Sequence, residues 1–142
     1  MQDHTAQKSL QIASAIVVAF GLITAAAALP AAAGITTFLV DLIFWPVDGA
    51  QSLAAPESRL LSAIGGGVMA GWGVMLWLVT TRLYTREPAL ARSIILTSIA
   101  TWFVIDSTCS ILAGAPLNAL LNVGFLLLFW VPLRKPYELR AA

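Results

Sequence analysis

Four long apolar segments, separated by short polar stretches, dominate the pattern of the chain. They cover about residues 10–29, 60–81, 90–112 and 117–133. Each is close to the ~20 residues that an α-helix needs to cross the hydrocarbon core of a bilayer. The pattern therefore predicts an all-α protein, an integral membrane four-helix bundle in which residues 1–142 form a single membrane domain.

A shorter apolar segment, about residues 35–45, lies in the first long connection. Asp41 interrupts this run and Pro46 ends it, so it is too short to span a bilayer. We expect an interfacial or re-entrant helix in the first extracytoplasmic loop, with Trp45 as an interfacial anchor. A simple extension of the first span followed by a loop is the alternative. At helical spacing, Ile35, Phe38, Leu39, Leu42 and Ile43 share one side of this helix, and Thr36, Thr37 and Asp41 share the opposite side.

The first span has a second interpretation as a signal peptide. Ala31-Ala32-Ala33 before Gly34 resembles a cleavage site that follows an apolar core. However, the polar leader carries a single lysine, Lys8, and the apolar run is longer than the usual core of a signal peptide. We therefore favour an uncleaved first span.

Small residues are concentrated in the first half of the second span. Ala63, Gly67 and Gly71 form a row of small residues four positions apart, and Gly66 lies beside it. Rows of this kind let membrane helices approach closely. We therefore expect Ala63, Gly66, Gly67 and Gly71 to be helix-packing residues.

The distribution of charge predicts the orientation in the membrane. The chain is 59% hydrophobic and 11% charged, with a mean hydropathy of +0.87. If both termini and the loop of residues 82–92 share one face, that face holds all the basic residues except Arg59. The positive-inside rule then predicts a multi-pass protein of the cell inner membrane with both termini in the cytoplasm. The basic residues of that face are Lys8, Arg82, Arg86, Arg92, Arg134, Lys135 and Arg140.

Cysteine and histidine usage limits the cofactors that one chain can hold. The chain has one cysteine, Cys109, and one histidine, His4. An internal disulfide, a site with several cysteine ligands and a haem held by two histidines are excluded within a single chain. We expect no haem or metal, leave any other cofactor unknown, and expect no nucleic-acid partner.

Asp106 lies inside the third span, where an acid is costly and usually has a partner or a purpose. In a helix pair with a tight turn near Gly114, Asp106 lies at the depth of Asn122, and Ser110 at that of Asn118. Without a counter-charge, the acid is expected to be neutral and to donate a hydrogen bond to the carbonyl oxygen of Asn122.

The same depth argument across the second loop places Trp72 beside Trp102, and Asp106 near Gly66 and Gly67. Two outcomes stay open: the glycines leave a small cavity beside Asp106, or they let the two helices close tightly. Asp106 is accordingly either a structural contact between helices or part of a binding site. The candidate binding residues are Asp106, Asn122, Asn118, Ser110, Cys109, Trp102 and Arg59.

The second span and the loop before it carry a resemblance to a known group. With Pro56-Glu57-Ser58-Arg59, Ala63-Ile64-Gly65-Gly66-Gly67 and Gly71-Trp72-Gly73, the layout resembles small bacterial inner-membrane proteins similar to the DoxX-like group. The resemblance implies a four-helix membrane bundle and transfers no catalytic residues.

Three classes of function follow from these residues. The first is a protein that binds a lipid, a quinone-like or another small apolar molecule, or an accessory subunit that joins a homo-oligomer or a larger membrane complex. The second is a small membrane enzyme that uses Asp106 as acid or base, with Asn122, Asn118 and Arg59 orienting the substrate. Proton-coupled transport is third, because no second relay residue is evident. Catalytic residues remain unassigned.

Overall fold

The computed structural model describes residues 2–134, and every regular element in this range is helical. Four of the helices are long and apolar enough to cross a membrane, and a fifth is short and apolar. Lys135 and Arg140, assigned above to the basic face, lie outside the described residues. The elements are α1 (Gln2–Ala26), η1 (Pro30–Ala32, a 3-10 turn), α2 (Gly34–Phe44), α3 (Pro56–Leu78), η2 (Val79–Leu83, a π-helical turn), α4 (Pro88–Leu112) and α5 (Pro116–Leu133).

Helices α1 and α3 both begin several residues before the apolar segments that predicted them. Helix α1 already begins in the polar leader, at Gln2. Helix α3 begins at Pro56, with Ala55 as its N-cap, and Ser58 lies inside its first turn. Proline is well suited to the first turn of a helix, because the N–H that it lacks would have no partner there.

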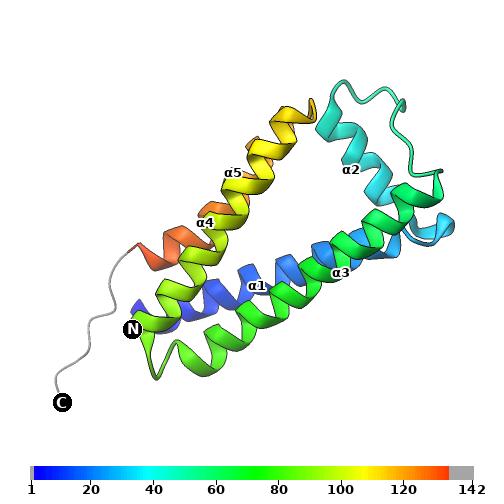
Figure 1. Ribbon diagram of the computed structural model, residues 1–142. Helices are drawn as coiled ribbons and strands as arrows, with labels where there is room; N and C mark the ends of the chain where they lie inside the picture. The colour runs from blue at the N-terminus through cyan, green and yellow to red at the C-terminus, as the bar shows by residue number, and fades with distance from the viewer. Residues whose placement is uncertain (1, 135–142) are drawn as a thin grey trace, which may run out of the picture.

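The long helices form two pairs that meet at one end and diverge toward the other (Figure 1). Helices α1 and α3 lie side by side as one arm, and α4 and α5 as the other. Helix α2 runs between the far ends of the arms and contacts both α1 and α5. The predicted all-α architecture with four long helices is confirmed. The four helices are arranged as a V whose open side is bridged by α2.

The hydrophobic core lies where the arms meet, which we call the closed end. Side chains from α1, α3, α4 and α5 pack together there around the buried ring of Tyr84. Arg92 also donates a hydrogen bond from Nε to the carbonyl oxygen of Leu133, at 2.8 Å, and so ties α4 to the end of α5. The buried core residues are Leu10, Ala13, Val17, Leu76, Tyr84, Ala91, Ile95, Ile99, Phe129 and Leu133.

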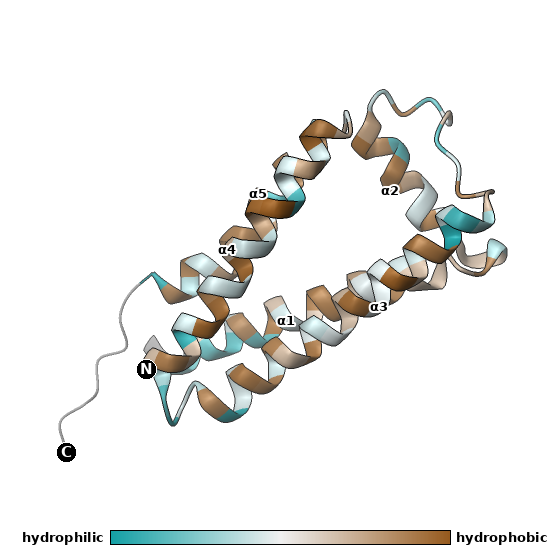
Figure 2. Ribbon diagram, viewed as in Figure 1, coloured by the Kyte–Doolittle hydropathy of each residue, from teal (hydrophilic) through white to brown (hydrophobic). Residues whose placement is uncertain are grey.

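Hydrophilic residues gather at the two ends of the V, and the arms between them are mostly hydrophobic (Figure 2). At the closed end they lie around the start of α1 and the link between α3 and α4. At the open end they lie around the start of α3 and the loop that follows α2. This distribution agrees with the predicted division of charge, in which the basic residues other than Arg59 share one face.

Glycines close the α1–α3 arm, but through a different row than expected. A Cβ atom at Gly66 would collide with the backbone of Gly21 and Ala25, and one at Gly73 would lie 2.7 Å from Val18 Cγ2. By contrast, Gly67 and Gly71 are exposed, and Ala63 is only half-buried. A Cβ at either exposed glycine would have no neighbour within 4 Å.

Within the described chain, Gly66 packs closely as expected, whereas Gly67 and Gly71 do not contact another helix. The closely packed row is Gly66, Ala70 and Gly73. A Cβ at Gly21 would lie 2.5 Å from Ala70 N, so the row faces α1 and not α4. The spacing of this row is one and two helical turns, which keeps its members on one face of α3.

Helix α2 turns its polar side inward. Thr36 and Asp41 are buried, whereas Ile35 and Phe38 are more than half exposed. Neighbouring segments bond one oxygen of each side chain: Thr36 Oγ1 donates to the carbonyl oxygen of Ile23 at 3.1 Å, and Gly49 N donates to Asp41 Oδ2 at 3.0 Å. The other carboxyl oxygen, Asp41 Oδ1, is buried without a hydrogen-bond partner among the described residues. The outer surface of α2 is therefore apolar.

Candidate functional site

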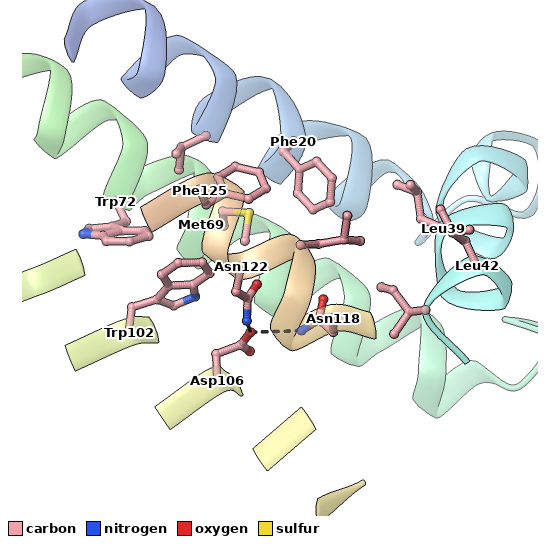
Figure 3. Close-up of a pocket in the computed structure, with 13 residues that line it drawn as sticks. Phe20, Leu39, Leu42, Met69, Trp72, Trp102, Asp106, Asn118, Asn122 and Phe125 are labelled. Carbon is pink, nitrogen blue, oxygen red and sulfur yellow. Dashed lines mark hydrogen bonds between the residues drawn. The ribbon is translucent and has the colours of Figure 1, made fainter. Parts of the chain in front are cut away.

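A cavity of about 300 Å³ lies between the two arms on the open side of the V (Figure 3). All five α-helices contribute to its wall, and the residues of α2 close it on the side away from the core. Most of the wall is apolar, and its carboxyl and carboxamide side chains come from α4 and α5 alone. The lining residues are Val17, Phe20, Leu39, Leu42, Ile43, Met69, Trp72, Trp102, Asp106, Asn118, Leu121, Asn122 and Phe125.

Aromatic rings connect the four long helices on the side of the cavity nearest the core. Trp72 and Trp102 lie 5.8 Å apart between ring centroids, which confirms the pair expected from their depth. Phe125 packs edge-on against Trp102 at 6.1 Å and against Phe20 at 5.5 Å. Such edge-on pairs are favourable geometries for aromatic rings. The rings therefore form a rigid boundary of the cavity.

A carboxyl–carboxamide cluster lies at one side of this cavity. Asn122 donates from Nδ2 to Asp106 Oδ2, and Asn118 donates from Nδ2 to the same oxygen at 3.0 Å. The second hydrogen bond of each amide goes to a serine of α4: Asn118 to Ser110 Oγ at 2.8 Å and Asn122 to Ser107 Oγ at 3.2 Å. The cluster thus joins α4 to α5 by four hydrogen bonds.

Both contacts predicted from helix depth are confirmed, since Asp106 meets Asn122 and Ser110 meets Asn118. The expected direction of the first hydrogen bond was wrong. Asp106 was expected to donate to the carbonyl oxygen of Asn122, but its carboxyl accepts from two amides instead. Helix rise fixes which residues lie at one depth, but not which of their atoms meet.

Two of the seven candidate binding residues lie away from the cavity. Cys109 is exposed and does not line the wall. Arg59 donates from Nη1 to the carbonyl oxygen of Ala54 at 2.8 Å, near the start of α3, and is also absent from the wall. Ser110 belongs to the hydrogen-bond cluster without lining the cavity, whereas Trp102 lines it.

Sequence reasoning missed Ser107 and the apolar wall. Ser107 directly follows Asp106, and its burial and its contact with Asn122 depend on the rotation of α4. Phe20, Met69 and Leu39 had no signal of their own, because apolar side chains occur on every face of these helices. Only the packing of the helices selects those that line the cavity.

Asp106 is the one ionisable side chain among the described residues that line this cavity. The described residues contain no group of three or more His, Cys, Asp or Glu side chains that could hold a metal ion. A scan against protein-family models, a search of curated proteins and a search of solved structures gave no match to the chain.

Proposed function

We propose that this chain is a multi-pass inner-membrane protein that binds a small apolar or lipid-like molecule in the cavity between its arms. The observation that carries the proposal is an otherwise apolar cavity with a single polar cluster, formed by Asp106, Asn118 and Asn122. Small-molecule sites are usually cavities of this kind, with a few polar groups that orient the ligand. Its volume, about 300 Å³, is at the lower end of the range for such sites.

Binding fits the cluster better than catalysis does. Acid–base chemistry generally requires a group matched to the reacting proton and a second group to complete the transfer. On the described cavity wall Asp106 has only carboxamides beside it, and these do not titrate. The enzyme alternative would need a further acid or base from a partner or from the substrate.

We further propose that the closed end faces the cytoplasm. Among the described residues, the basic side chains of Lys8, Arg82, Arg86 and Arg92 belong to that end, where the positive-inside rule expects them. In this orientation α2 lies at the outer interface with its apolar surface toward lipid, and the exposed Trp45 fits the aromatic belt of that interface.

Labelling of single cysteines tests this topology. In a Cys109→Ala background, Ser52→Cys in the loop after α2 should react with a membrane-impermeant maleimide added to bacterial cells with permeabilised outer membranes. Thr85→Cys, in the link between α3 and α4, should react only after lysis. Both positions are exposed, so a difference in labelling reports the side of the membrane. The reverse pattern would contradict the proposed orientation.

Filling the cavity tests the binding proposal. Leu39 lines the cavity, whereas its neighbour Phe38 is 55% exposed on the outer surface of α2. Leu39→Trp should lower the occupancy of 1-dodecanol, measured by native mass spectrometry of the protein in phosphatidylcholine nanodiscs, by about tenfold, because the larger ring occupies the site. Phe38→Trp is the matched control and should bind as the unmodified protein does. Equal binding by the two variants would contradict the site.

A second candidate function is that of an accessory subunit. Gly67 and Gly71, four positions apart, share an exposed face of α3, and a Cβ atom at either would meet nothing within 4 Å. Small residues on a membrane helix allow the close approach of another helix. Co-migration with a larger complex in mild detergent that is lost in Gly67→Leu would support this role.

A further inference from the structure

The carboxamide donors of the polar cluster, Asn118 Nδ2 and Asn122 Nδ2, are fully used by the protein itself. A carboxamide nitrogen carries two hydrogens. Asn118 Nδ2 donates to Asp106 Oδ2 and to Ser110 Oγ, and Asn122 Nδ2 donates to Asp106 Oδ2 and to Ser107 Oγ. Neither amide therefore has a hydrogen left for a ligand.

The acceptors of the cluster are not used up. Asp106 Oδ1 and the carbonyl oxygens of Asn118 and Asn122 receive no hydrogen bond within residues 2–134. In Figure 3 both carboxamide oxygens point away from Asp106. What the cluster offers to an occupant of the cavity is thus a set of oxygen acceptors.

The cluster also lacks a positive charge from the protein. No Lys, Arg or His side chain is among the described residues that line the cavity. The basic residue at the open end, Arg59, is bonded to Ala54 at the start of α3. An unpaired carboxylate in an apolar cavity is strongly unfavourable, and a cation beside it removes much of that cost.

We propose that the cavity selects an apolar molecule whose polar head donates hydrogen bonds, and above all a long-chain primary amine in its ammonium form. This inference rests on the proposed binding function and specifies its ligand class. An ammonium group has three donors and no acceptor, and hydrogen bonds from a charged donor to a carboxylate are roughly twice as strong as neutral ones. Trp72 and Trp102 add aromatic faces, which favour organic cations.

A hydroxyl head fits the same acceptors more weakly, because it has one hydrogen and no charge. A head that only accepts, such as an ether, an ester or an oxidised quinone, finds no free hydrogen on Asn118 or Asn122 and cannot bond to the Asp106 carboxylate. The cavity is therefore expected to rank heads in the order amine, alcohol, ether.

Three probes with the same chain test this ranking on the unmodified protein: dodecylamine, 1-dodecanol and dodecyl methyl ether. Each is titrated into the protein in phosphatidylcholine nanodiscs, binding is read by native mass spectrometry, and empty nanodiscs correct for partition. We expect the amine to bind about 10- to 100-fold more tightly than the ether, with the alcohol between them.

An acid-to-amide substitution then tests the role of the carboxyl. Asp106→Asn should lower the affinity for dodecylamine about tenfold or more and change that for the ether little, because the charge is lost while the shape is kept. Glu57→Gln is the matched control, since Glu57 is exposed in the first turn of α3 and should leave all three affinities unchanged.

The outcomes separate the two proposals. If the ether binds as tightly as the amine, the donor rule is overturned and the binding function stands. If none of the probes binds, and Leu39→Trp behaves like Phe38→Trp, the binding function itself fails. The probe ranking does not depend on any variant, so it remains decisive even if Asp106→Asn does not fold.

Discussion

The two arms of this protein hold their helices together in different ways. Helices α1 and α3 meet through small residues, and their backbones are so close that Gly21, Gly66 and Gly73 have no room for a Cβ atom. Helices α4 and α5 meet through four hydrogen bonds around Asp106 and through the bond from Arg92 to the end of α5. One arm thus depends on close packing and the other on polar contacts.

The difference reflects what an apolar solvent leaves available. In the proposed membrane setting, lipid is as apolar as the helix surfaces. Burial of hydrophobic groups would then drive little association, and close packing and hydrogen bonds would hold the helices together. Here the α1–α3 arm relies mainly on close packing, and the α4–α5 arm relies mainly on hydrogen bonds. The packed arm contributes only apolar and aromatic side chains to the cavity wall, whereas the hydrogen-bonded arm contributes Asp106, Asn118 and Asn122. In the second arm, the residues that hold the helices together are therefore also the polar residues of the cavity.

The largest expected effect comes from adding one methyl group to the packed arm. Gly66→Ala should destabilise the protein by about 1–3 kcal/mol, because the Cβ collides with backbone and not with a movable side chain. Unfolding by SDS in mixed micelles measures the change. Gly67→Ala is the matched control one position along the helix, where a Cβ meets nothing. It should be neutral or slightly stabilising, since alanine is the better helix former.

If Gly66→Ala and Gly67→Ala proved equally stable, the packing of α1 against α3 would be wrong. The two arms would then no longer differ in how their helices are held together. The result does not depend on whether the cavity binds anything, so it tests the fold separately from the function.

A smaller effect is expected in the hydrogen-bonded arm. A double-mutant cycle between Asp106→Ala and Asn122→Ala should give a coupling energy of about 0.6–2 kcal/mol, the range for polar contacts between membrane helices. The same unfolding measurement supplies the four free energies. Pairing Asp106→Ala with Ser93→Ala, an exposed serine near the other end of α4, should be additive. Additivity for both pairs would contradict the hydrogen bond between Asp106 and Asn122.

Some of this arrangement could be predicted from the order of residues alone. The apolar runs predicted four long helices and a short one, and the fixed rise of a helix placed Asn122 at the depth of Asp106 and Trp102 beside Trp72. These predictions needed only distances along antiparallel neighbours. They succeeded because short connections join α3 with its extension η2 to α4, and α4 to α5.

The rotation of the helices could not be predicted in the same way. Of the small residues expected to pack, Gly66 lies in a close contact, whereas a Cβ at Gly67 or Gly71 would meet nothing within 4 Å. The contact also includes Gly73, which was not expected, and it faces α1 instead of α4. An even distribution of apolar side chains around a helix leaves its rotation undetermined. Cys109 was assigned to the site from its position beside Asp106 along the chain, but it is exposed and does not line the cavity. Arg59 was expected to orient a substrate there, but it bonds to Ala54 and is also absent from the wall.

The sequence by itself therefore determined the number of long apolar helices, the separation of charge between their ends and the depth of the lone acid. Only the tertiary structure decided that the arms diverge, that α2 bridges them and that Asp106 lies on a cavity wall. Hydropathy and helix rise give positions along the helix axis, and both follow directly from the order of residues. The directions in which helices face one another depend on packing between segments far apart in the chain.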